Sequence, residues 1–138
     1  MAGYVGFLAE GPITWSSFRL TVTPLSSCQG EYHAATKAAV MSKAYGDILR
    51  FAGFPSSGAA PVFCDNRAAV LLSESDISIK KLRHVATQIA FLRELVNSED
   101  IALIHISTVG QIADIYTKPL PAAIFHELRA HLTAPQVV

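Results

Sequence analysis

The chain has 138 residues, which is enough for one domain and too few for two of ordinary size. Hydrophobic residues make up 51% of the sequence and charged residues 16%, a balance that argues against intrinsic disorder. Eleven basic and eleven acidic side chains leave no formal net charge, so any contact with nucleic acid has to come from a local patch.

The sequence also bears on membranes and cellular compartment. Every apolar run is shorter than the ~20 residues of a membrane-spanning helix, so we expect no membrane partner. The N-terminus lacks a basic segment followed by an apolar one and gives no indication of a secretory signal. Cys28 and Cys64 form no C-x-x-C pair, which favours two buried thiols over a disulfide. An intracellular location, in the cytoplasm or the nucleus, is therefore expected.

The N-terminal segment predicts a β-hairpin. Residues 4–8 and 13–18 are rich in strand-forming side chains, and Glu10-Gly11-Pro12 between them is typical of a turn. We therefore expect these two runs to pair antiparallel.

A long helix is predicted next. Ser26, with Gln29 three residues later, has the spacing of a capping box and indicates where the helix begins. Apolar side chains then recur at three- and four-residue steps until Gly53 and Pro55 end the pattern. Glu31 lies on this apolar stripe and is expected to face inward.

The remainder of the chain alternates apolar runs with helical patterns. In chain order we expect a buried strand at 61–65, a helix after Asp65, a longer helix at 84–96, a strand at 101–106, a short helix at 110–116 and an amphipathic helix at 122–132. This order predicts an α/β domain with mixed strand pairing.

Three carboxylates stand where α/β proteins commonly place functional groups. Asp65 follows an apolar strand, whereas Glu31 and Asp114 are expected in the first turns of two helices. Each also has a structural explanation. An acid in a first turn complements the helix dipole, and an Asp after a strand is a common N-cap.

The residues around these acids resemble a known family. The segments LSSCQGEY (25–32), VFCDNRAA (62–69) and QIADIYTKPL (111–120) are similar, in order and spacing, to the ribonuclease H domain of copia-type LTR retrotransposon Pol polyproteins. Shorter matches at 3–5, 13–17, 53–55 and 91–94 extend the resemblance over nearly the whole chain. It implies a ribonuclease H-like mixed sheet flanked by helices over residues 1–134, followed by a disordered tail at 135–138.

The resemblance also implies an activity. Members of this family hydrolyse the RNA strand of an RNA–DNA hybrid, using four carboxylates that hold two Mg²⁺ ions. Mg²⁺ prefers oxygen ligands, and two ions can activate the water and stabilise the leaving oxygen. Glu31, Asp65 and Asp114 match three of the four catalytic, metal-binding positions. The implied partners are the hybrid and the reverse transcriptase portion of a parent polyprotein.

The fourth family position is missing. It is an Asp on a strand directly before the segment that matches Gly3-Tyr4, and that strand is the centre of the family's five-stranded sheet. Its loss leaves two half-sheets separated by ~10 Å, or lets them close so that 4–8 pairs antiparallel with 62–65. A neighbouring polypeptide or a second copy could also donate the strand. We expect cleavage by this chain to be very low or nil.

Several side chains could contact a hybrid through its phosphates and 2′-hydroxyls. These are Arg67, Lys80, Lys81, Arg83, His84 and Lys118. A solvated surface loop is the alternative interpretation of the basic cluster. Trp15 and Tyr32 are expected in the core or at a sheet edge rather than as base-stacking platforms.

Two functional alternatives stay open: a catalytically inactive nucleic-acid-binding or interaction module that retains the fold, and a fragment begun at an internal methionine that folds poorly.

Overall fold

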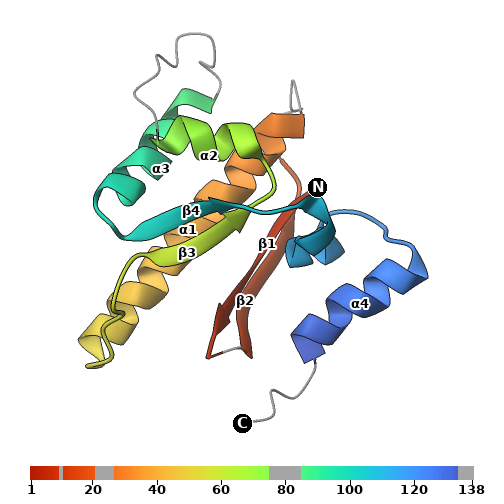
Figure 1. The fold of residues 1–138 in the computed structure, drawn as a ribbon, viewed down its shortest axis with the longest axis horizontal. Coiled ribbons are helices and arrows are strands. Elements are labelled where there is room, and N and C mark those ends of the chain that lie inside the picture. Colours follow the sequence, from red (N-terminus) through yellow and green to blue (C-terminus); the bar gives the residue numbers. More distant parts are fainter. Residues whose placement is uncertain (10, 21–26, 75–84, 134–138) are drawn as a thin grey trace.

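A computed structural model describes residues 1–9, 11–20, 27–74 and 85–133 (Figure 1). The basic cluster at 80–84, the tail at 135–138, Glu10 and the capping residue Ser26 all lie outside this part of the chain. Our expectations for them therefore stay predictions.

The predicted hairpin is confirmed. Strands β1 (Ala2–Leu8) and β2 (Gly11–Phe18) pair antiparallel, with Ala2 opposite Phe18 and Leu8 opposite Gly11. The register shifts between Gly6 and Phe7, where the ladder accommodates a bulge.

The long helix is also confirmed, as α1 (Ser27–Phe51). Its apolar stripe places Tyr32, Ala35 and Ala39 in the core. The helix ends as the sequence predicts, because Gly53 adopts a positive φ of 87° that glycine tolerates without strain. The backbone N–H of Phe54 then donates to the carbonyl of Leu49, which satisfies one of the last helical acceptors.

A second, parallel sheet carries most of the core. Strands β3 (Ala60–Cys64) and β4 (Ile101–His105) pair in parallel, and helices α2 (Arg67–Glu74) and α3 (Ala86–Asn97) lie between them in the sequence. The buried side chains of this unit pack against α1. They are Val62, Cys64, Ala69, Val70, Val85, Ile89, Leu92, Leu95, Ile101 and Leu103. Among the described residues, Cys64 is buried and forms no disulfide, as expected, and its Sγ accepts the backbone N–H of Asn66 at 3.4 Å. The side chain of Cys28 is not described.

The four described strands do not join into one mixed sheet and follow the first of the two expected alternatives, in which the half-sheets stay apart. They form two separate sheets of two strands each, β1 with β2 and β3 with β4 (Figure 1). The alternative in which 4–8 pairs with 62–65 is therefore wrong. Helix α1 contacts both β1 and β3, so each half-sheet is anchored to the same helix by its own contacts and does not need the other edge.

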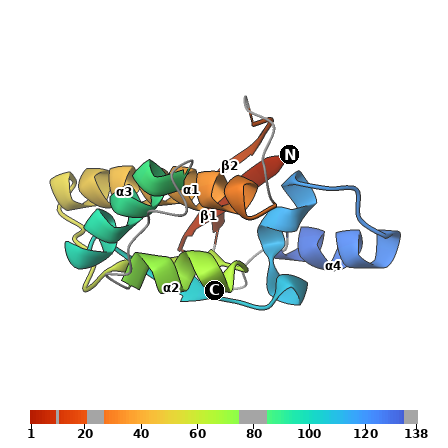
Figure 2. The same cartoon turned by 90° about the horizontal axis from the view of Figure 1, so that it is seen from above.

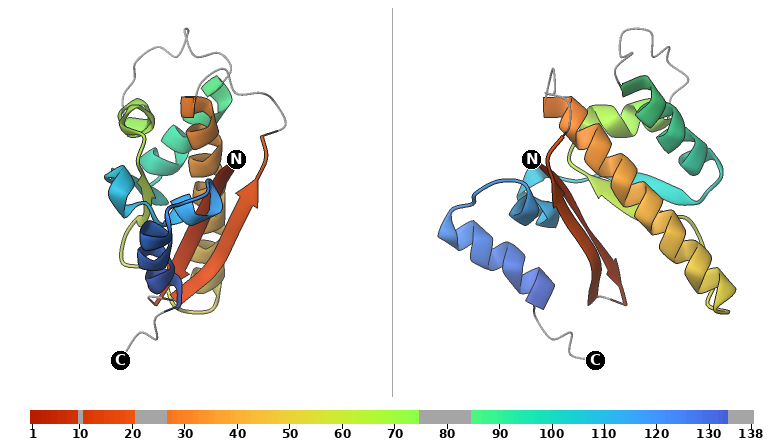
Figure 3. Two further views of the ribbon diagram at one scale, coloured as in Figure 1. Left: turned by 90° about the vertical axis from the view of Figure 1, so that its right-hand side faces the viewer. Right: turned by 180° about the vertical axis from the view of Figure 1, so that it is seen from behind.

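The predicted helix at 110–116 is replaced by two short 3₁₀ helices, η2 (Thr108–Gly110) and η3 (Ile112–Tyr116). Gln111 between them has an extended backbone, with φ −79° and ψ 94°, and this interrupts any continuous helix. Element η3 packs against β1 and against the last helix, α4 (Ala122–Thr133). Figures 2 and 3 place α4 on the far side of the hairpin from α2 and α3.

The α/β class is thus confirmed, with small sheets and flanking helices. Within the described ranges, no helix has both the length and the apolar character needed to cross a bilayer.

Candidate functional site

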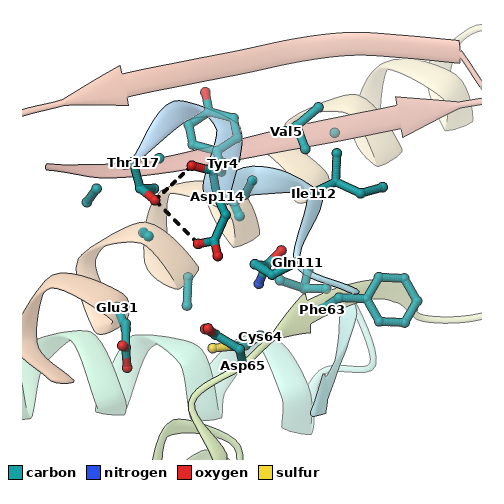
Figure 4. Close-up of a pocket in the computed structure, with 18 of the residues that line it drawn as sticks. Tyr4, Val5, Glu31, Phe63, Cys64, Asp65, Gln111, Ile112, Asp114 and Thr117 are labelled. Carbon is teal, nitrogen blue, oxygen red and sulfur yellow. Dashed lines mark hydrogen bonds between the residues drawn. The ribbon is translucent and has the colours of Figure 1, made fainter. Parts of the chain in front are cut away.

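A cavity of about 820 Å³ separates the two sheets (Figure 4). One wall is β1 and the opposite wall is β3, while α1 forms the back and the segment 110–118 closes one end. The three carboxylates singled out from sequence all line this cavity, at that end. The fold therefore brings together residues that are far apart along the chain.

Glu31 reaches the cavity from α1. The helix begins at Ser27 and its first turn contains no acidic residue, so the expectation of a first-turn glutamate is wrong. Placing Glu31 one turn further in weakens its interaction with the positive end of the helix dipole, which falls off within the first turn. Helix stabilisation therefore does not account for this carboxylate.

Asp65 lies directly after β3, in the turn that leads into α2. The side chain that caps α2 is not Asp65 but its neighbour Asn66, whose Oδ1 accepts the N–H groups of Ala68 at 2.9 Å and Ala69 at 3.2 Å. The N-cap explanation for Asp65 is thus wrong, because Asn66 caps the helix. The sequence carried this information, since Asn is as good a cap as Asp.

Asp114 lies on η3 and already has partners. Lys118 places its Nζ 2.6 Å from one carboxylate oxygen, and the hydroxyl of Thr117 donates to the other at 3.3 Å. The Asp114 side chain is 15% exposed, so this ion pair is partly shielded from water. Thr117 was not singled out from sequence, and only the turn at the end of η3 shows its role.

The three acids influence one another electrostatically. The pKa of Glu31 lies above its ordinary value, first because burial disfavours the charged form and next because Asp65 carries a like charge nearby. The charge of Asp114 raises this pKa further, whereas a hydrogen bond with Asn66 and the charge of Lys118 lower it. The charges of both other carboxylates therefore act on Glu31.

The fit of these acids to metal ions is incomplete. Carboxylate oxygens are the donors that Mg²⁺ prefers. However, no group of three or more His, Cys, Asp and Glu side chains able to hold a metal ion occurs among the described residues. Asp114 is instead engaged by Lys118 and Thr117. In this arrangement the acids do not form a metal centre, and no catalytic step through a metal follows from it.

Two of the predicted nucleic-acid contacts can be placed. Arg67 is exposed at the start of α2, two residues beyond Asp65, and Lys118 is 49% exposed beside Asp114. Tyr32 is buried in the core, and Trp15 lies exposed on β2, an edge strand, so neither forms part of the cavity. This agrees with their expected positions in the core and at a sheet edge.

Sequence comparisons identify relatives along most of the chain. It is 30% identical over 123 residues to the retrovirus-related Pol polyprotein from transposon RE2 of Arabidopsis thaliana, an alignment that covers 89% of the chain and 8% of that protein. It is 27% identical over 135 residues to the Pol polyprotein from transposon RE1 of the same plant, covering 98% of the chain and 9% of the relative.

A third relative comes from tobacco, Nicotiana tabacum. The Pol polyprotein from transposon TNT 1-94 is 29% identical over 119 residues, covering 86% of the chain and 9% of its own length. The chain thus spans less than a tenth of the curated relatives it matches. No protein-family model matches the chain, and no solved structure matches it. Homologues of this chain are therefore retrovirus-related Pol polyproteins of transposons.

Proposed function

We propose that this chain is a retrotransposon-derived, ribonuclease H-like domain that engages RNA–DNA hybrids. The observation that carries this proposal is the convergence of Glu31, Asp65 and Asp114, from three separate elements, on one end of a single cavity. The transposon Pol homologues support the same origin. The parent activity is Mg²⁺-dependent hydrolysis of the RNA strand.

The chain by itself should cleave very weakly or not at all. Among the described residues, its carboxylates do not form a group able to hold a metal ion, and Lys118 forms an ion pair with Asp114. In this function, Arg67 and Lys118 flank the acids and contact the phosphates of a bound hybrid, which positions the duplex without reading its sequence.

The test is a cleavage assay on a hybrid with end-labelled RNA, in the presence of Mg²⁺ or Mn²⁺. We expect at most trace cleavage by the wild-type chain, and its loss in Asp65→Asn supports the assignment of the site. Cleavage at equal rates by both proteins would contradict that assignment, because the activity would then not depend on the acidic cavity.

A specific observation favours a second candidate function. Because Lys118 and Thr117 engage the Asp114 carboxylate, the fold is compatible with an inactive module that only binds nucleic acid. Binding of the same hybrid, measured over a series of salt concentrations, tests this function separately. Salt-dependent binding without cleavage supports it, and absence of binding at low salt contradicts both functions.

A further inference from the structure

The acidic end of the cavity contains a cationic side chain as well as the three carboxylates. Lys118 lines the cavity together with Glu31, Asp65 and Asp114. Its Nζ lies 2.6 Å from Oδ2 of Asp114. Among the lining residues that the structure describes, Lys118 is the one lysine or arginine. The carboxylates therefore have a single ammonium group beside them.

The backbone fixes Lys118 beside Asp114. The N–H of Thr117 donates to the carbonyl oxygen of Asp114 at 3.0 Å, and the N–H of Lys118 donates to the same oxygen at 3.4 Å. The Thr117 hydroxyl also contacts both this carbonyl oxygen and a carboxylate oxygen of Asp114 (Figure 4). Because this turn already holds the two charged residues together, their ion pair costs less conformational entropy than a pair between two mobile surface side chains.

The charge of Lys118 also acts on a second carboxylate. Burial and the charge of Asp65 raise the pKa of Glu31 most, the charge of Asp114 raises it further, and Lys118 acts in the opposite direction. Glu31 belongs to α1 and Asp114 to η3, so Lys118 stabilises the charged forms of acids from two separate elements. An ammonium group in this position reduces the repulsion among the three acids.

A divalent cation would need oxygens that Lys118 already engages. Mg²⁺ binds carboxylate oxygens at about 2.0–2.1 Å in a demanding octahedral geometry. The ammonium group occupies one oxygen of Asp114, and its positive charge repels a cation that approaches the other. The ion pair thus gives a physical reason why the described carboxylates do not form a metal centre.

We infer that the Lys118 ammonium is the built-in counter-ion of this acidic cavity and takes the place of a divalent cation there. Lys118 is thereby a specificity-determining residue, because its charge decides whether the cavity accepts such an ion. The inference rests on the acidic cavity of the proposed function. Its test uses no nucleic acid, so it can fail while hybrid binding is observed, and it can hold while hybrid binding fails.

The first test removes the charge of Lys118 and measures binding of Mn²⁺ through its effect on water-proton relaxation. We expect Lys118→Gln to bind Mn²⁺ at least tenfold more tightly than the wild type, because the Asp114 carboxylate then becomes a ligand. Lys37→Gln is the matched control. Lys37 lies exposed on α1 over the ring of Phe18 and does not line the cavity, so Mn²⁺ binding should be unchanged. Equal affinities of the wild type and Lys118→Gln, or an equal gain in Lys37→Gln, would overturn the inference.

Two further variants separate the charge of Lys118 from the shape of its side chain. Lys118→Arg keeps the positive charge and should bind Mn²⁺ as weakly as the wild type. Adding Asp114→Asn to Lys118→Gln should abolish the gain, because the released carboxylate is then absent. A full gain in Lys118→Arg, or a gain that persists in the double variant, would overturn the inference.

Thermal unfolding supplies an independent measurement. Without added cation, Lys118→Gln should have a lower Tm than the wild type, because the acids lose their counter-ion. Millimolar Mn²⁺ should raise the Tm of this variant and change that of the wild type little. Equal rises in both proteins would overturn the inference.

If Lys118→Gln does not fold, the wild type and Asp114→Asn decide. No rise in the Tm of the wild type with Mn²⁺ supports exclusion of the cation. A rise that disappears in Asp114→Asn would overturn the inference, because the carboxylate would then bind the cation despite Lys118.

Discussion

At the scale of single residues, Asn66 determines how the neighbouring Asp65 carboxylate is interpreted. Asp65 has the position of an N-cap, yet Asn66 provides the cap and leaves the Asp65 carboxylate to the cavity. Glu31 then lies near a like charge and is partly buried, which raises its pKa. Functional sites commonly group acidic side chains so closely that each one disfavours the charged form of the others. A bound ligand then offsets this repulsion.

The raised pKa of Glu31 has a consequence for stability. The folded chain holds this proton more tightly than the unfolded chain, so the free energy of unfolding falls as pH rises from about 4.5 through the folded pKa. In Glu31→Gln this decrease is absent. We therefore expect the variant to gain stability relative to the wild type at pH 7 and to lose that advantage at pH 4, in urea unfolding.

Glu94→Gln, at an exposed position on α3, is the control for this substitution. Its stability relative to the wild type should change little between pH 4 and pH 7. A stability advantage of Glu31→Gln that is the same at both pH values would contradict the explanation by charge.

At the scale of elements, close approach of η3 to β1 places Asp114 at the cavity. A Cβ added at Gly3 would lie 2.8 Å from the carbonyl oxygen of Ser16 and 2.9 Å from the Cβ of Tyr116. Glycine at this position therefore lets η3 pack directly on the strand. The two half-sheets are positioned differently, β1 by η3 and α1, and β3 by α1 and α2.

Gly3→Ala should destabilise the fold by about 1–3 kcal/mol, because backbone atoms must shift to admit the methyl group. Gly46→Ala is the matched control, since a Cβ at Gly46 has no neighbour within 4 Å. In the interior of α1 this control should stabilise the protein by about 0.5–1 kcal/mol. Thermal unfolding measures the change in stability caused by each substitution. Equal changes in the two variants would contradict the close packing at Gly3.

The cap of α2 gives a second prediction at this scale. Asn66→Ala removes the acceptor for two backbone N–H groups and should lower the free energy of unfolding by about 1 kcal/mol. Asn97→Ala, at an exposed position at the end of α3, should change it far less. Denaturant unfolding measures the free energy of unfolding of the two variants. Similar decreases in both would contradict the capping role of Asn66.

At the scale of the whole molecule, the core is concentrated on one side of the cavity. The buried cluster draws its members from α1, β3, α2, α3, β4 and Val85. Among the described residues, the hairpin adds Ala2 and α4 adds Leu128 to the buried hydrophobic set. The part of the molecule beyond the cavity therefore rests on fewer buried apolar contacts.

Native-state hydrogen exchange should reveal this asymmetry. We expect amides of α3 and β4 to exchange at least tenfold more slowly than those of β2 and α4, because local opening of the weakly buried elements exposes little apolar surface. Equal protection of β2 and β4 in the free protein would contradict the one-sided core.

Local pattern was sufficient for the hairpin, for α1 with its glycine end and for the strands at 60–64 and 101–105, because turn residues and periodicity act over a few neighbours. The order of the motifs was also sufficient to indicate kinship with transposon Pol polyproteins. The prediction of one helix at 110–116 was wrong because Gln111 has an extended backbone conformation, which separates two 3₁₀ helices.

Tertiary structure alone decided that the half-sheets stay apart and that Lys118 holds Asp114. Both outcomes depend on where α1, β1 and η3 lie relative to one another. Such placement is set by packing between residues remote in the chain, which no local periodicity encodes.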